Sequence, residues 1–228
     1  MADVYDARLL RLFGLIVLAK TVDFAARGAA LWLVAAWLAA GAFVYLGYRW
    51  ALPAVTVLTA VAFAAGFQNQ HMWLLLWLPV TFLVGSEDRR WLWRWQTTIL
   101  YGYAVVAKIT PDYLSGRRIE AALGDIPAFV VVALALGGLA AEAFLAFGLW
   151  RWPWAKWVGV AFHVSVVATM TTGPVHTLRL AVFGALVLLM YEGFTPARPA
   201  MGEHQPSSPG RHDCSPARPT SPVSATRR

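Results

Sequence analysis

The sequence predicts an all-α protein whose helices form a polytopic transmembrane bundle of about eight spans. Three observations lead to this prediction. The chain is 59% hydrophobic and 14% charged, whereas soluble domains carry about 25% charged residues. Its apolar residues come in long runs, and short segments between the runs hold most of the charges. No run sustains the alternation of a β-strand, which argues against a sheet-based fold.

The expected helices follow the apolar runs along the chain. The first apolar run, residues 9–19, shows no clean small-residue cleavage site and is followed by Lys20, Asp23 and Arg27, so we interpret it as part of a retained helix and not as a signal peptide. The third, fourth and fifth runs are short for a full span, so they either extend into the interface or are re-entrant. The expected helices are 9–26, 30–48, 52–67, 72–85, 95–109, 126–150, 154–170 and 175–191.

The distribution of basic residues predicts the orientation. Arginine and lysine in short loops collect on the cytoplasmic side of a membrane. The bias favours a multi-pass protein of the cell inner membrane with both termini in the cytoplasm. The residues expected outside are Arg27, Arg117, Arg118 and Arg179. The residues expected inside are Arg8, Arg11, Arg49, Arg89, Arg90, Arg94, Arg151, Lys156 and the arginines after residue 195.

Composition divides the chain into a transmembrane domain, 1–194, and a tail, 195–228. The tail is rich in Pro, Ser, Arg and Gly and has no apolar period, so we expect it to be disordered and cytoplasmic. The single cysteine, Cys214, lies there and excludes an intramolecular disulfide. The net charge of +7 comes from the loops and the tail, so the lipid bilayer, and not nucleic acid, is the expected partner.

Charged residues within apolar runs have either a structural or a functional explanation. Lys20 and Asp23 are three residues apart, and Asp23 and Arg27 are four apart. Both spacings place side chains on one helix face. We therefore expect a structural ion pair that includes Asp23 and Arg27.

Two further polar positions lie at the expected outer ends of helices. His71 ends the segment FQNQH, which is either a polar turn or part of a site, since histidine titrates near neutral pH. Lys108 is either a snorkelling lysine, paired with Asp112 four residues later, or a desolvated neutral amine that acts as a base.

Glu142 and His163 lie deep within two expected helices. They either fix helix packing, as a buried hydrogen-bonded pair or each bonded to its own neighbours, or provide a proton path or cofactor contact. The sequence contains no motif of a soluble enzyme, and we expect no metal site, since His71, His163 and His176 would have to converge to form one.

The stretch around Lys108 carries a family resemblance. From Gln96 to Lys108 the sequence reads QTTILYGYAVVAK, and from Asp112 to Gly116 it reads DYLSG. This order resembles the motif Q-x(n)-Y-x-x-A-x-x-K-x-x-x-D-W-x-x-G of the horizontally transferred transmembrane (HTTM) superfamily, which includes the vitamin K-dependent γ-carboxylase. The segment QNQH, which ends at His71, is similar to an Asn-His segment of that family.

The resemblance implies a function and assigns roles to residues. It implies a quinol-linked membrane enzyme in which Lys108 is the base that deprotonates a reduced quinone, vitamin K or menaquinol, and His71 assists. The residues implied to support the site are Gln96, Asp112, Gly116, Glu142 and His163. The implied substrate is a secreted peptide or a small molecule, and in the γ-carboxylase the chemistry is proton abstraction followed by carboxylation.

Two other interpretations remain open from the sequence. The chain could be a non-catalytic membrane factor for peptide maturation, immunity or complex assembly. It could also be a small quinone-binding subunit of a redox system.

Overall fold

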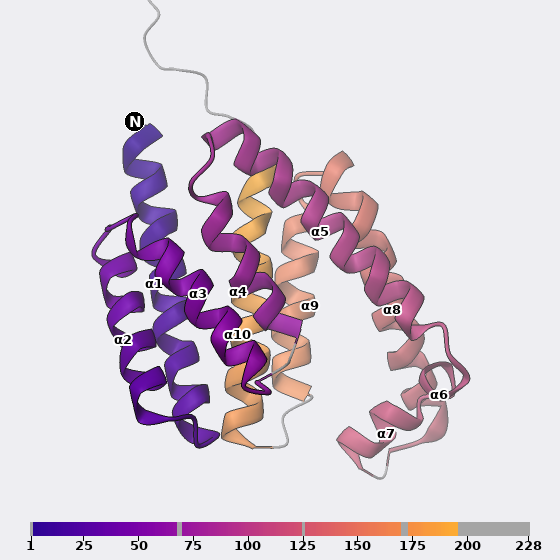
Figure 1. Ribbon diagram of the computed structural model, residues 1–228. Helices are drawn as coiled ribbons and strands as arrows, with labels where there is room; N and C mark the ends of the chain where they lie inside the picture. The colour runs from indigo at the N-terminus through magenta and orange to yellow at the C-terminus, as the bar shows by residue number, and fades with distance from the viewer. Residues whose placement is uncertain (1, 68–69, 125, 170–172, 196–228) are drawn as a thin grey trace, which may run out of the picture. The chain divides into compact units, whose positions relative to one another are not determined.

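The computed structural model describes residues 2–67, 70–124, 126–169 and 173–195, and these residues are helical throughout, with no strand among them. The all-α prediction is therefore confirmed. The elements are α1 (Ala2–Ala26), α2 (Leu31–Tyr45), α3 (Ala51–Ala64), α4 (Gln70–Thr81), α5 (Ser86–Lys108), α6 (Pro111–Leu114), α7 (Arg117–Leu123), α8 (Ala128–Arg151), α9 (Ala155–Thr169), α10 (Pro174–Met190) and the 3-10 helix η1 (Tyr191–Phe194) (Figure 1). The expected tail, 195–228, lies outside the described residues except for Thr195.

Helix length does not confirm eight full spans. Among the described helices, two are long and apolar enough to cross a membrane, Ala128–Arg151 with 24 residues and Pro174–Phe194 with 21. The apolar helices α2, α3, α4 and α9 are shorter, at 10–17 residues. At about 1.5 Å per residue, a helix of 15 residues spans about 22 Å, less than the roughly 30 Å of a bilayer core.

Helix α5 begins earlier than the apolar run predicts, at Ser86 instead of residue 95. Its first turn contains Glu87 and Asp88, whose charges favour a helix N-terminus. Tertiary contacts then hold the basic part of the helix. Arg89 is 2% exposed and pairs with Asp6 of α1, while Arg94 Nε donates to the carbonyl oxygen of Gly193 at 2.7 Å. The apolar period alone could not reveal a helix that uses arginines for packing.

The core is built from the long helices along the whole described chain, α1 to α5 and α8 to α10. Helix α1 packs against α2 and α10, α3 packs against α4, and α5 packs against α8 and η1 (Figure 1). Tyr5 of α1 also donates to the carboxylate of Glu192 in η1 at 2.5 Å. The largest fully buried apolar side chains are Phe13, Phe24, Trp37, Leu52, Met72, Leu75, Leu78, Trp93, Leu145 and Leu186.

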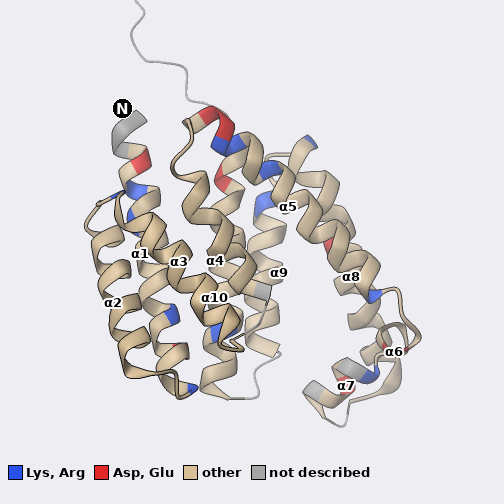
Figure 2. Ribbon diagram, in the orientation of Figure 1, with Lys and Arg blue, Asp and Glu red and all other residues tan. Residues whose placement is uncertain are grey.

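The polarity of the surface is the reverse of what a water-soluble domain shows. Helices α2, α3 and α4 carry no Lys, Arg, Asp or Glu (Figure 2). Large apolar side chains point outward, as with Leu31 at 82% exposure, Phe129 at 76% and Phe147 at 75%. Four charged side chains are buried among the described residues, and two of them, Lys20 and Asp23, are 0% exposed; the other two are Arg89 and Glu142.

Two short helices that the sequence analysis did not predict, α6 and α7, lie against α8. Thr110 caps α6, because its hydroxyl accepts the backbone N–H of Tyr113 at 3.3 Å. Gly116 precedes α7 with φ of +78°, a conformation that favours glycine, and a Cβ there would overlap the side chain of Val131. Gly116, which the resemblance placed at the site, thus has a clear structural role in the turn.

Candidate functional site

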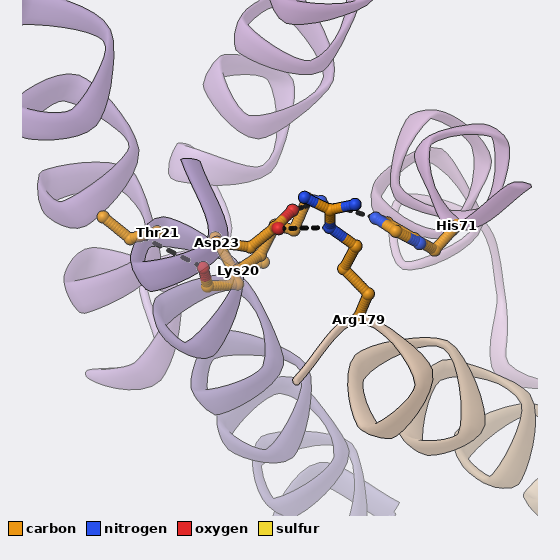
Figure 3. A network of polar contacts seen from close by, with 6 residues as sticks. Lys20, Thr21, Asp23, His71 and Arg179 are labelled. Carbon is orange, nitrogen blue, oxygen red and sulfur yellow. Dashed lines mark hydrogen bonds and ion pairs between the residues drawn. The ribbon is translucent and has the colours of Figure 1, made fainter. Parts of the chain in front are cut away.

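Four polar side chains from three helices form the Lys20 cluster, which we define as Lys20, Asp23, His71 and Arg179 (Figure 3). Lys20 Nζ donates to Asp23 Oδ2 and lies 2.5 Å from His71 Nε2. Arg179 Nε donates to Asp23 Oδ1 at 2.7 Å. The first three side chains are buried, and Arg179 is 31% exposed. The cluster therefore joins α1, α4 and α10 through charged hydrogen bonds in the interior.

The expected ion pair between Asp23 and Arg27 is wrong. Both oxygens of Asp23 are taken by Lys20 and Arg179. Helix α1 ends at Ala26, and Arg27 lies in the turn that follows it. Its guanidinium lies over the ring of Phe67, 4.7 Å from the centroid.

Lys108 is held by Glu142. Its Nζ donates to Glu142 Oε1, with side-chain exposures of 27% and 8% for the two residues. The same ammonium lies over the ring of Tyr113, 5.4 Å from the centroid. Burial raises the pKa of Tyr113, and the charge of Glu142 raises it further, so this phenol stays neutral. The other carboxylate oxygen, Glu142 Oε2, is buried with no partner among the described residues.

The alternative pairing of Lys108 with Asp112 is also wrong. Helix α5 ends at Lys108, and α6 begins at Pro111 with its own axis, so the two residues do not share a helix face. Asp112 lies 3.6 Å from Arg117 instead, and both side chains are exposed, at 61% and 72%.

The structure does not join His71 to Lys108. His71 contacts Lys20 of α1, and Lys108 contacts Glu142 of α8. The amine beside His71 is therefore that of Lys20, for which the sequence predicted only a structural role. A lysine in the middle of an apolar run was the signal that could have identified it.

A third group, the Tyr101 triad, consists of Tyr101, His163 and Tyr191, all buried. Tyr101 Oη lies 2.8 Å from His163 Nε2 and also bonds to the hydroxyl of Tyr191. Glu142 and His163 are not bonded to each other, and each is bonded to a neighbouring side chain, which is one of the structural arrangements expected from the sequence. The sequence analysis missed both tyrosines, since a tyrosine in an apolar helix gives no sign of its hydrogen-bond partner.

The remaining expected site residue, Gln96, is half-buried on α5 and lies outside all three groups. Among the described residues, no three His, Cys, Asp or Glu side chains gather to hold a metal ion. An apolar groove of about 380 Å³ lies between α2 and α3 and is lined mainly by alanines. It contains none of the residues of the three groups.

Comparison with known proteins gives no further assignment, since no family model, curated protein or solved structure matches the chain. The HTTM assignment therefore remains a prediction that rests on the residues quoted for it.

Proposed function

We propose that the chain is a multi-pass protein of the cell inner membrane with both termini in the cytoplasm. The supporting observation is the exposure of large apolar side chains on helices that bury their charges, an arrangement that lipid favours and water does not. Short helices can be accommodated by local thinning of the bilayer and by flanking aromatic residues at the interface.

Within this framework we propose an HTTM-type enzyme that removes a proton from a lipid-soluble hydroquinone, with Lys108 as the base. The Lys108–Glu142 pair is the observation that carries the proposal. The lysine stands at the end of α5 with 27% of its side chain exposed, so a substrate can reach it. The amine of Lys20 is 0% exposed and cannot meet a substrate in this conformation.

The proposed step requires a neutral amine at Lys108, and Glu142 is the group placed to take up the proton. A proton shift along the hydrogen bond from Nζ to Oε1 converts the ion pair into a neutral amine and a carboxylic acid, and no charge has to leave the site. The neutral amine then accepts the hydroxyl proton of the hydroquinone. The O–H bond breaks as the N–H bond forms, which leaves an ammonium and a hydroquinone anion.

The role of His71 changes in this proposal. The resemblance implied that it assists Lys108, but its ring nitrogen is engaged by Lys20. Glu142 is the residue in position to adjust the protonation of Lys108. We therefore assign Glu142 as the positioning residue and leave His71 outside the proton transfer.

The test measures loss of menaquinol under air in proteoliposomes, by mass spectrometry of the lipid extract. The hydroquinone anion passes two electrons to dioxygen and, with one added proton, gives quinone and hydrogen peroxide. We expect Lys108→Arg to slow turnover by about 10²-fold or more, because arginine cannot lose its proton. Glu142→Gln should lower the rate and also shift its pH profile. A loss of packing alone would lower the rate without shifting the profile.

Lys156→Arg is the matched control, since it makes the same exchange in α9 beside Trp157, away from the pair. It should keep the wild-type rate. Full activity of Lys108→Arg would refute the base role. No acceleration by the wild-type protein would refute the enzyme and favour a non-catalytic membrane factor. Quinone that co-purifies with the protein would, in that case, favour a quinone-binding subunit.

A further inference from the structure

We propose that the Lys20 cluster, together with Arg27, binds a small oxyanion such as a carboxylate or phosphate group. The proposal is independent of the quinol chemistry, because it uses none of the residues around Lys108. It rests on the balance of charge in the cluster and on the donors that remain free there.

The charge balance is positive. Within the cluster, Lys20 and Arg179 share the single carboxylate of Asp23. Arg27 follows on the same segment, and its guanidinium lies over the ring of Phe67, which meets the ring of Phe24 at 5.3 Å. Lys20 also lies over the ring of Phe24, 4.8 Å from the centroid, so its surroundings are largely apolar. Desolvated charges are stable only when they are paired, and here the buried ammonium of Lys20 shares its one counter-charge with Arg179, so a bound anion would balance the excess.

The neighbouring segments cannot supply the missing negative charge. The residues at 68–69, beside His71, are Gln and Asn, and those at 170–172, before α10, are Met, Thr and Thr. All of these side chains are neutral. An amide from residues 68–69 could accept a hydrogen bond from an arginine, but it would leave the net charge unchanged.

Two arginines, Arg179 in the cluster and Arg27 on the segment after Asp23, keep free donors among the described residues. Arg179 uses only Nε in the hydrogen bonds among described residues, and 31% of its side chain is exposed, so its terminal N–H groups are accessible. Arg27 Nη1 is buried and has no partner among the described residues. A planar guanidinium offers two parallel N–H groups, which match two oxygens of a carboxylate or phosphate. Chloride is a point charge and cannot match this fork in the same way.

The experiment measures the melting temperature of the purified full-length protein in detergent by intrinsic tryptophan fluorescence. Sodium acetate and sodium phosphate are titrated at constant ionic strength, with chloride as the reference anion. A ligand that binds only the folded state raises Tm by about 5 to 10 °C at one hundred times Kd for a chain of this size. We expect such a rise with at least one oxyanion and not with chloride.

Variants locate the site. Arg27→Gln should weaken the oxyanion response by about tenfold or more, and Arg27→Lys, which keeps the charge without the fork, should give an intermediate value. Arg117→Gln is the matched control, since this exposed arginine lies on α7 next to Asp112. It should respond as the wild type does. Equal responses in all variants would show a general salt effect and overturn the proposal. Absence of any response would also overturn it, and the excess positive charge would then be removed by a neutral Lys20 and not by a bound anion.

Discussion

Replacing Asp23 with asparagine tests the Lys20 cluster most directly. The substitution keeps the size and shape of the side chain but removes the carboxylate to which, among the described residues, both Lys20 and Arg179 are bonded. The ammonium of Lys20 then remains buried without a counter-charge. We expect Asp23→Asn to lower the stability of the folded protein strongly.

The magnitude follows from burial. Lys20 and Asp23 are both 0% exposed, and removing one partner of such a pair costs about 3–5 kcal/mol. At roughly 2–4 °C per kcal/mol for a chain of this size, Tm should fall by about 6–20 °C. Asp112→Asn is the matched control, because Asp112 and Arg117 are 61% and 72% exposed. Exposed pairs contribute about 0–1 kcal/mol, so this variant should shift Tm by about 4 °C at most.

The assay is thermal unfolding of the detergent-solubilised protein, followed by tryptophan fluorescence. A second substitution checks the cause. Adding Lys20→Met to the Asp23→Asn variant removes the unpaired ammonium and should recover much of the lost stability. If Asp23→Asn changes Tm no more than Asp112→Asn does, Lys20 is not held as a buried cation and the reasoning is wrong.

Further predictions concern helix packing, topology and the tail. Gly159→Ala should lower the free energy of unfolding by about 1–3 kcal/mol, because its Cβ would overlap the hydroxyl of Tyr191. Gly102→Ala is the control in the same melting assay: its Cβ meets open space, so the substitution should be neutral or stabilising. A reporter fused after Arg228 should be active only in the cytoplasm, and extracytoplasmic activity would require an odd number of spans. Deleting the residues after Ala197 should leave the yield of detergent-extracted protein unchanged, because the tail sequence offers no apolar surface for packing; a loss of folded protein would contradict this.

The sequence was sufficient to predict the helical class, because runs of apolar residues without strand alternation leave few other ways to satisfy the backbone. It also singled out polar positions within those runs that the structure places in hydrogen bonds between side chains, including Asp23, Lys108, Glu142 and His163. It did not predict α6 and α7, since the local signals there are a cap at Thr110 and a turn at Gly116, and neither produces an apolar period.

Only the tertiary structure decided which polar residues meet. Spacing along one helix predicted partners three and four residues away, and this was correct for Lys20 with Asp23 but wrong for Asp23 with Arg27 and for Lys108 with Asp112. The partners found instead come from other helices, with separations of 156 residues for Asp23–Arg179 and 34 for Lys108–Glu142. Spacing predicts a shared face only while one helix continues, and α5 ends at Lys108, before Asp112. The partner that a buried charge needs then comes from another helix that packs against it.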